Sequence, residues 1–257
     1  MYDPRGGIAY RAGDWTLRAG GGVYSQGPWR VRYKVPDSGA PSGIPTQARH
    51  GGFGAQRDGA LPARIGAYSK SYSDYVDEGA GPRIVNGRSR GVDALVRYTA
   101  FDRVAGWVSY SLLDARFELA DGATVRGNND VTHTLTGVAR TSITDTWDLG
   151  TTVRYGTGRP QTPIVDATAV PDGRGFAPVY GPINGERLPD YFRIDGRLMH
   201  LRPVGSSLFV FYVEGLNLLD HANVLAYSYD RTYRQRRGVE SFFSERTLVL
   251  GVEASFC

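Results

Sequence analysis

The sequence predicts an all-β fold: an antiparallel up-and-down transmembrane β-barrel, of which about eleven strands are present here as an open half-barrel. Two observations predict it. Apolar and polar residues alternate over segments that often run to about ten residues or more, and the connections between these segments are alternately short and long. Globular strands usually have about 5–6 residues, whereas strands that cross a bilayer at a tilt need about 9–11.

The segment at residues 146–156 shows the alternation most clearly. Side chains in a strand point alternately to opposite faces of the sheet. We expect one set to face lipid, namely Trp147, Leu149, Val153 and Tyr155. We expect the other set to face the lumen, namely Asp148, Thr152 and Arg154. A soluble β-sandwich also alternates, but arginine and aspartate in the middle of long strands are typical of a water-filled lumen.

The expected strands follow one another along the whole chain. They lie at residues 5–12, 15–24, 49–57, 61–75, 87–100, 105–118, 131–142, 146–157, 190–202, 207–219 and 241–256. The long connections are residues 25–48, 76–86, 119–130, 158–189 and 220–240. Outer-membrane barrels have short periplasmic turns and long extracellular loops. We therefore expect the long connections to be extracellular and mobile, with few ladder hydrogen bonds, and the C-terminus to be periplasmic.

Composition excludes several classes of protein. The single cysteine, Cys257, allows no intramolecular disulfide, and no stretch approaches the roughly 18 apolar residues of a membrane-spanning helix. The formal net charge is +4. A basic balance suggests nucleic acid or lipopolysaccharide phosphate as partners, but arginines that line a polar surface are the more ordinary explanation. We expect no nucleic-acid partner.

No motif for metal binding or catalysis is present in the sequence. The histidines lack the HExxH spacing of a zinc site, so no metal or cofactor is expected. His50 and His221, at predicted loop edges, are candidate contacts for a ligand that contains iron or cobalt. A hydrolase would need His133 to meet Ser109 or Ser111, with Asp130 as the acid. Lumen-facing polar residues pair across strands without catalysis, so the chain is not expected to be an enzyme.

Aromatic residues suggest two further features. Trp15, Trp107, Trp147 and Tyr155 lie near predicted strand ends, as in the aromatic girdles of membrane barrels. Aromatic and arginine side chains of the long loops are candidate ligand contacts, because these residue types are common at recognition surfaces. The candidates are Trp29, Arg30, Tyr33, Tyr180, Tyr227, Arg231 and Tyr233.

Six stretches resemble, in their order and spacing, strands and loops of TonB-dependent receptors. They are 213–220 (VEGLNLLD, with Asn223 and Val224 after it), 155–163 (YGTGRPQTP), 187–195 (RLPDYFRID), 87–93 (GRSRGVD), 64–72 and 245–256. The resemblance implies that residues 1–257 are the C-terminal part of such a barrel. The plug domain, the TonB box and the first half of the barrel have no counterpart here, and we interpret Met1 as an internal start codon or the start of a truncated gene.

The resemblance also implies a function. Family members take up a bulky nutrient across the outer membrane, such as a ferric siderophore, a cobalamin or an oligosaccharide, with energy delivered by the TonB complex through the plug. The expected partners are therefore outer-membrane lipid, the nutrient and, through the absent plug, TonB. The alternative is a passive porin or an adhesin-type barrel closed by oligomerisation. A continuous ladder between residues 5–12 and 245–256 would mean a closed small barrel and would favour the porin.

Overall fold

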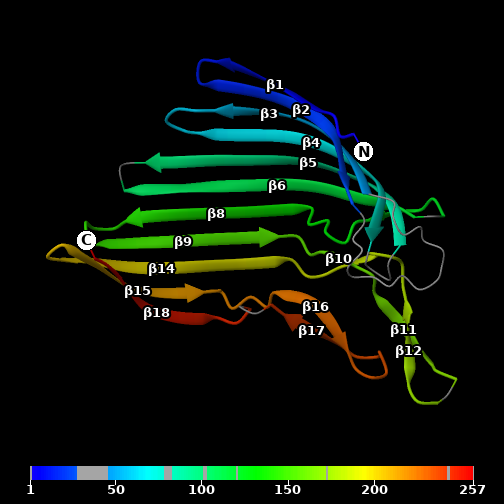
Figure 1. Cartoon of the computed structure of the whole chain (residues 1–257). Helices are drawn as coiled ribbons and strands as arrows, with labels where there is room; N and C mark the ends of the chain where they lie inside the picture. Colours follow the sequence, from blue (N-terminus) through cyan, green and yellow to red (C-terminus); the bar gives the residue numbers. More distant parts are fainter. Residues whose placement is uncertain are drawn as a thin grey trace.

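The molecule is one curved antiparallel sheet with small hairpins at one end (Figure 1). The computed structural model describes residues 2–27, 46–77, 83–100, 103–119, 121–171, 173–241 and 244–256. All regular elements in these ranges are strands. None of the described residues belongs to a helix that could span a membrane.

Eleven strands follow one another across the main sheet, in chain order. They are β1 (Arg5–Ala12), β2 (Trp15–Gln26), β3 (Thr46–Arg57), β4 (Ala63–Asp77), β5 (Arg83–Ala100), β6 (Val104–Glu118), β8 (His133–Ser142), β9 (Trp147–Gly156), β14 (Tyr191–Val204), β15 (Ser207–Leu216) and β18 (Thr247–Ser255). Every predicted strand is present, with its ends shifted by a few residues. The short and long connections alternate as predicted except between β4 and β5, which are separated by residues 78–82, as few residues as separate β3 from β4.

The long connections contain more regular structure than the sequence predicted. The connection at 158–189 holds two small sheets, β10 (Pro160–Gln161) with β13 (Glu186–Arg187) and β11 (Ile164–Ala169) with β12 (Phe176–Tyr180). The connection at 220–240 holds the hairpin of β16 (Val224–Tyr229) and β17 (Arg236–Glu240), and β7 (Thr124–Arg126) pairs with β6. The expectation of few ladder bonds is therefore wrong for these loops, because their ends pair with one another once the barrel strands hold them close together.

The predicted loop at 76–86 is also too long. Strand β4 continues to Asp77 and β5 begins at Arg83, because the ladder resumes beyond a register shift between Tyr72 and Tyr75. Conversely, the expected strand at 241–256 begins too early, because β18 starts at Thr247. Residues 28–45, the centre of the first predicted loop, lie outside the described residues.

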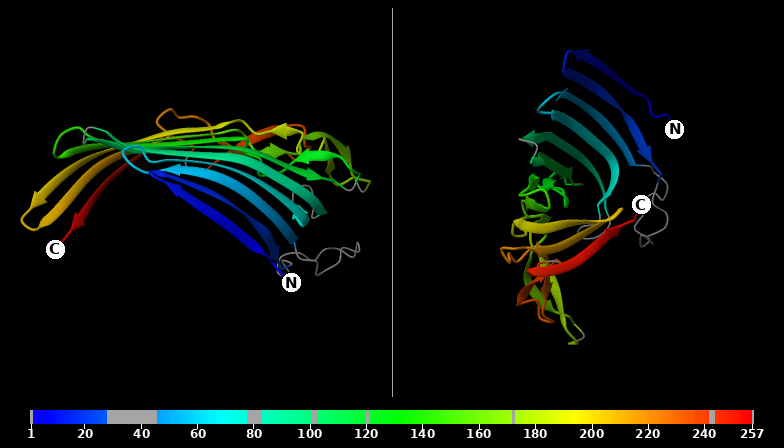
Figure 2. Two further views of the ribbon diagram at one scale, coloured as in Figure 1. Left: turned by 90° about the horizontal axis from the view of Figure 1, so that it is seen from above. Right: turned by 90° about the vertical axis from the view of Figure 1, so that its left-hand side faces the viewer.

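The sheet is an open arc (Figure 2). Strands β1 and β18 are its two edges, and in the described residues no ladder joins residues 5–12 to residues 245–256. Both edge strands run from the end that carries the hairpins towards the end that carries the short turns (Figure 1). The prediction of an open half-barrel is confirmed, and the small closed barrel expected of the alternative is not formed.

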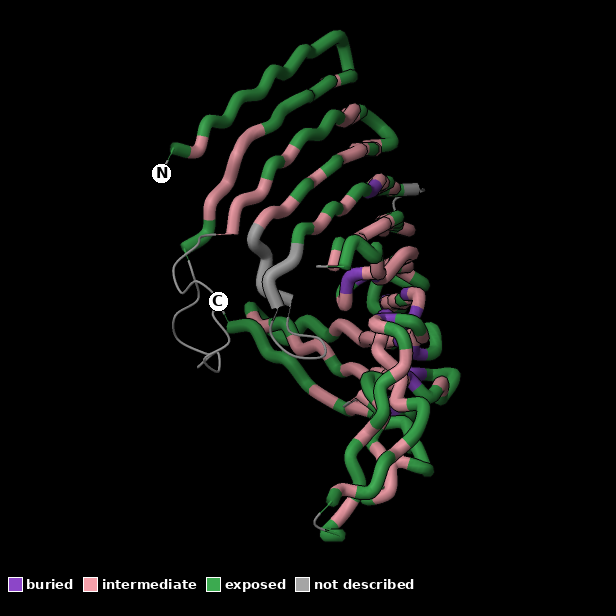
Figure 3. The backbone as a smooth tube through the Cα atoms, turned by 90° about the vertical axis from the view of Figure 1, so that its right-hand side faces the viewer, coloured by how far each residue is buried: buried purple, intermediate pink, exposed green. Residues whose placement is uncertain are grey.

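The sheet has almost no hydrophobic core (Figure 3). In the described part of the chain Leu188 is the only buried large apolar side chain, and it belongs to a loop. Large apolar side chains of the sheet are instead exposed, among them Ile8 (74%), Phe53 (70%) and Leu250 (70%). A contiguous exposed apolar surface in a protein marks contact with lipid or with another protein.

The exposed apolar side chains lie on one face of the sheet, which we call the outer face. Residues paired in an antiparallel ladder point to the same side, so the register shows which side chains share a face. One register line crosses the sheet from β1 to β14 and consists of apolar or aromatic residues. It runs through Tyr10, Leu17, Ala55, Ile65, Ala94, Tyr110, Leu135, Tyr155 and Phe192.

The opposite face, which we call the luminal face, is polar and carries cross-strand ion pairs. Arg154 donates to Asp195 at 2.8 Å, and Arg197 donates to Glu253 at 2.5 Å. Arg140 contacts Asp148, which also accepts a hydrogen bond from Ser142 at 2.6 Å. The separation of the apolar and polar sets of β9 is confirmed.

The prediction that Trp107 belongs to an aromatic girdle is wrong. Trp107 pairs with Val138, which pairs with Thr152 on the luminal face. Its position near a strand end suggested the girdle, but the parity of β6 points its side chain inwards. Trp15 and Trp147 do lie on the outer face, half exposed, at the end with the short turns.

Candidate ligand-binding site

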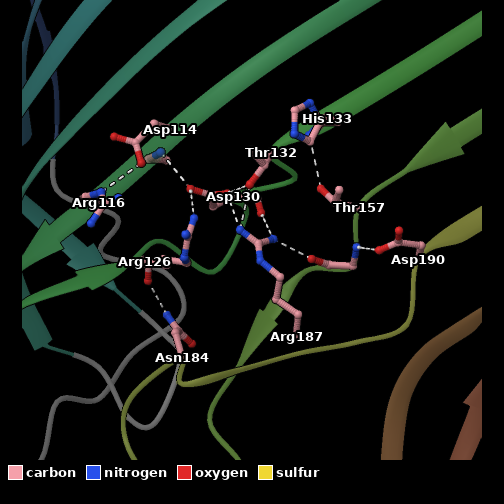
Figure 4. A network of polar contacts seen from close by, with 12 residues as sticks. Asp114, Arg116, Arg126, Asp130, Thr132, His133, Thr157, Asn184, Arg187 and Asp190 are labelled. Atoms are coloured by element: carbon pink, nitrogen blue, oxygen red, sulfur yellow. Dashed lines mark hydrogen bonds and ion pairs between the residues drawn. The ribbon is translucent and has the colours of Figure 1, made fainter.

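The roots of two long loops are joined by a polar network around Asp130, a residue that is 0% exposed (Figure 4). Arg187, from β13, donates to the Asp130 carboxylate at 2.8 Å, to the Asp130 backbone oxygen at 2.7 Å and to Thr132 at 2.7 Å. The other carboxylate oxygen accepts a hydrogen bond from the backbone N–H of Ala115 at 2.9 Å. The loop after β9 is thereby fixed to the loop after β6.

The environment of Asp130 lowers its pKa. Burial alone would raise the pKa, but the hydrogen bonds from Ala115, Arg187 and Thr132 stabilise the charged carboxylate and outweigh burial. The group lies beyond the spanning strands, at the loop roots.

A lowered pKa predicts how this loop contact depends on pH. A carboxylate with a depressed folded-state pKa contributes its full stability above the unfolded value of about 3.9 and loses it as the pH falls through the folded value. We expect the Ala115 amide to stay protected from hydrogen exchange between pH 7 and about 4, and to lose protection below. Exchange corrected for its intrinsic pH dependence measures this, with Asp130→Asn as the control that lacks the transition. Loss of protection between pH 7 and 5 would contradict the assignment.

Asn184 adds a second contact between the same two loops. Its side-chain amide donates to the backbone oxygen of Arg126 and to the side-chain oxygen of Asn128, both at 2.6 Å. Nearby, Asp190 accepts hydrogen bonds from the Gly158 amide at 3.0 Å and from the Tyr155 hydroxyl at 2.8 Å. A side chain at Gly158 would collide with the backbone of Leu188, so only glycine fits there.

The root of the last long loop is built around Asn217. This residue has a positive φ of 51° and is 0% exposed. Its backbone N–H donates to the Asp195 carboxylate at 2.9 Å, and its side-chain NH2 group donates to the backbone oxygens of His221 and Ser244. Asn223, 1% exposed, is bonded through its side chain to both backbone groups of Phe192, at 2.9 and 3.0 Å. The loop therefore folds back onto β14 before its hairpin begins.

The long connections at 158–189 and 220–240 also contact each other. Arg236 of β17 donates to Glu186 of β13 at 2.7 Å, and its guanidinium lies 4.5 Å from the ring centre of Tyr227. The hydrogen bond to Glu186 raises the pKa of Arg236. Arg159 donates to the backbone oxygen of Leu225 at 3.0 Å. These contacts hold the two connections against each other beyond the end of the sheet (Figure 1).

The predicted ligand contacts are not gathered into one site in the described residues. Tyr227 packs against Arg236, and Tyr233 lies 6.3 Å from Tyr229, between ring centres. Arg231 is exposed at the tip of that hairpin, and Tyr180, 57% exposed, belongs to the separate hairpin of β12. Trp29, Arg30 and Tyr33 lie outside the described residues. Ligand contact by these side chains stays a prediction.

The structure reveals a cluster on the luminal face that sequence reasoning missed. The guanidinium of Arg5 lies 4.2 Å from the ring centre of Tyr24, which stacks on His50 at 4.5 Å. Tyr72 meets His50 edge-on at 6.5 Å, and the Lys70 ammonium lies 4.9 Å from the ring of Tyr68. His50 is therefore a strand residue and not a loop-edge residue. The only sequence signal was the recurrence of aromatic and basic residues at luminal parity in neighbouring strands.

A shallow hollow of about 600 Å³ lies beside this cluster. Its floor is backbone, because Gly20, Gly52, Gly54 and Gly66 place no side chains there, and Arg18 and Arg64 stand at its edge. A Cβ atom at Gly54 would lie 2.8 Å from the backbone oxygen of Ile65, so a side chain at this position would clash with the neighbouring strand. The luminal wall over β1 to β4 is therefore wide, cationic and aromatic, which suits an anionic or aromatic ligand.

The residues of the hypothetical hydrolase are not assembled. His133 contacts the Tyr110 hydroxyl at 2.7 Å on the outer face, whereas Ser111 lies on the luminal face and contacts Asp93. The Asp130 carboxylate is hydrogen-bonded to Arg187 and not to His133. Within the described ranges no group of three histidine, cysteine, aspartate or glutamate residues is placed to hold a metal ion.

Comparison with known proteins identifies the fold. No family model matches the sequence, and no curated protein matches it either. Solved structures do match. The ferric citrate transporter FecA superimposes with a TM-score of 0.70 at 18% identity, over 98% of this chain and 38% of that protein. The ferric-catecholate import receptor Fiu of Escherichia coli K12 gives 0.67 at 17% identity, over 97% of this chain and 34% of that one.

The ferripyoverdine receptor of the Pseudomonas aeruginosa outer membrane is similar too, with a TM-score of 0.66, 14% identity and coverage of 98% of this chain and 32% of the receptor. This chain has the fold of a TonB-dependent receptor barrel. It spans about a third of the length of these receptors. They are a transporter, an import receptor and an outer-membrane receptor, and the predicted outer-membrane barrel fold is confirmed.

Three of the six stretches that resemble this receptor barrel contain residues that anchor its loops. Arg187 and Asp190 of the RLPDYFRID stretch hold the loop after β9. Gly158, in YGTGRPQTP, gives the close approach of that loop to Leu188. Asn217 and Asn223 turn the chain after β15. Asn217 and Asn223 are buried, and each is hydrogen-bonded, as buried polar groups at a loop root must be.

Proposed function

We propose that this chain forms about half of the barrel of an outer-membrane receptor that takes up a bulky nutrient. The observation that carries the proposal is the division of one curved sheet into a continuous apolar face and a charged luminal face, with no core beneath either. Open edges on β1 and β18 leave backbone groups unpaired, which is unfavourable in lipid. We infer that strands outside residues 1–257 complete the barrel, and that residues 1–257 are its C-terminal part.

The two edges restrict what can complete the barrel. Because β1 and β18 run in the same direction, a second copy in the same orientation would meet each edge in parallel. Up-and-down barrels pair all their strands antiparallel. A separate segment with an odd number of strands satisfies both edges. In this proposal the segment, a plug and the TonB complex supply the coupling that this chain lacks.

The substrate class is proposed from the luminal cluster and the neighbours. The cluster around Tyr24, His50 and Lys70 combines positive charge with aromatic rings, and the similar structures are receptors for ferric citrate, ferric catecholates and ferripyoverdine. An anionic ferric chelate matches this chemistry better than a neutral oligosaccharide or cobalamin. Saturable binding distinguishes such a receptor from a passive porin or an adhesin.

The test is a binding titration on the purified membrane protein that contains this chain. We expect ferric citrate, a ferric catecholate or ferripyoverdine to quench tryptophan fluorescence saturably, and Tyr24→Ala with Lys70→Gln to weaken binding about tenfold. The matched control is Tyr10→Ala, an aromatic residue of the outer face. Diffusion of small sugars through the protein in liposomes, without saturable binding of any chelate, would support the porin and overturn the proposal.

A further inference from the structure

A row of arginines crosses the outer face just beyond the end of the apolar surface. The ladder pairs Arg49 of β3 with Ser71 of β4, Ser71 with Arg88 of β5, Arg88 with Arg116 of β6, and Arg116 with Arg126 of β7. These positions therefore stand side by side on one face. Strands lie about 4.8 Å apart, so the row is roughly 20 Å wide.

Arg88, in the middle of the row, lies near the depth of lipid headgroups. On the same face, the last apolar row is formed by Phe53, Val92 and Leu112, linked through Ala67. Arg88 is four residues beyond Val92 on β5, which is about 13 Å along the strand and about 10 Å along the membrane normal at a tilt of roughly 40°. The headgroup layer extends about 5–8 Å beyond the hydrocarbon, and arginine side chains reach back to it.

A further arginine lies between the row and the apolar surface. Arg90 is two residues beyond Val92 and is paired with Asp114. On the other side of the arc, the same face ends in Tyr155 of β9 and Phe192 of β14, which are aromatic. The row of arginines thus lies on the β3–β7 side of the barrel wall.

The charges of this patch are only partly balanced within the protein. Arg116 is paired with Asp114 at 2.8 Å, and Arg126 lies 3.7 Å from Asp130, whose carboxylate is already bound by Arg187. Glu118 is the next acid on that face. Among the described residues no acid is placed against Arg49 or Arg88, and Asp114, the acid opposite Arg90, is bound to Arg116; Arg49, Arg88 and Arg90 are exposed. Like charges directly opposite on neighbouring strands destabilise a sheet, so the row favours bound anions.

We propose that these five arginines, Arg49, Arg88, Arg90, Arg116 and Arg126, bind the phosphate groups of a phosphorylated glycolipid of the outer leaflet. The inference rests on the membrane placement proposed above and not on the nutrient. Guanidinium groups bind phosphate oxygens in bidentate geometry. The apolar surface directly below, at Phe53, Ile65 and Leu112, is open to acyl chains. The patch therefore matches both halves of an amphiphile, whereas free phosphate would use only one.

The test measures glycolipid binding by the membrane protein that contains this chain, held in phosphatidylcholine nanodiscs. Native mass spectrometry with added bisphosphorylated lipid A gives the affinity. We expect Arg49→Gln, Arg88→Gln and Arg116→Gln together to weaken binding at least tenfold, and the corresponding triple lysine variant to retain most of it. The control variant combines Arg57→Gln and Arg202→Gln, exposed arginines of the outer face at the opposite end of the strands.

The outcomes separate this inference from the proposed function. Heat-modifiable electrophoretic mobility shows that each variant is folded and inserted, so binding is compared only between inserted proteins. Equal binding by the glutamine triple variant and the parent would overturn the inference. So would equal binding of dephosphorylated lipid A or of phosphatidylglycerol, or full displacement by equimolar inorganic phosphate. Failure of the nutrient titration leaves this result unchanged.

Discussion

Replacing Val153 by arginine is expected to block insertion of the sheet into a bilayer, whereas Thr152→Arg is expected to leave insertion intact. The two residues are neighbours on β9, but Val153 pairs with Ile194 on the outer face and Thr152 with Asp195 on the luminal face. An arginine that faces lipid near the middle of a membrane costs roughly 2–4 kcal/mol. On the luminal face the same side chain stays in water and meets the Asp195 carboxylate.

The measurement is the folded fraction after dilution from urea into lipid vesicles, detected by protection from added protease. The matched pair controls for strand propensity and side-chain size, since both variants introduce arginine into the same strand. Equal folded fractions for the two variants, or a larger loss for Thr152→Arg, would show that the two faces are assigned the wrong way round. Spin labels at positions 153 and 154 give an independent assignment of lipid and water contact.

Removing the Arg187 side chain is expected to release the loop that follows β9. Asp130 is fully buried, and Arg187 provides the ion pair and two further hydrogen bonds at that point. Breaking a buried pair by deleting one partner costs about 3–5 kcal/mol, because the remaining charge is left uncompensated. Hydrogen exchange across residues 126–132 and 158–189 measures the loss of protection.

The control for this variant is Arg231→Ala, an exposed arginine at the tip of the β16–β17 hairpin. It removes the same charge from a long loop without touching the loop roots, and should leave exchange unchanged. Restored protection in the double variant Asp130→Asn with Arg187→Gln would support the explanation by uncompensated charge. Unchanged exchange in Arg187→Ala would mean that the loop is held by its hairpins alone.

The position of the strands was predictable because it depends on local pattern. An alternation such as that of residues 147–155 assigns each side chain to a face whatever the neighbouring strand is, and glycine, proline and aspartate mark the connections. Trp107 shows the limit of this reasoning. The girdle prediction for Trp107 rests on its distance from a strand end, whereas the face that a side chain takes depends on its parity in the strand. The luminal face of β6 carries apolar residues such as Trp107 and Leu113, so the alternation in this strand is too weak to assign the two faces.

The candidate site was less predictable, because its contacts join distant parts of the chain. Arg187 and Asp130 are 57 residues apart, and nothing in either local sequence selects the other. The cluster of Arg5, Tyr24 and His50 depends on the register of β1, β2 and β3. The hairpins within the long loops form only after the barrel strands bring the loop ends together.

The sequence by itself determined the all-β class, the order of the strands and the chemistry of the two faces, since a period of two residues is a local property of an extended chain. Only the tertiary structure decided which polar groups meet. Register across β3 to β7 turns Arg49, Arg88 and Arg116 from scattered charges into one row, and the open edges of β1 and β18 follow from strand pairing. The pairing of the strands therefore decides both the arginine row and the open edges, and a shift of register by one residue would move every side chain to the other face.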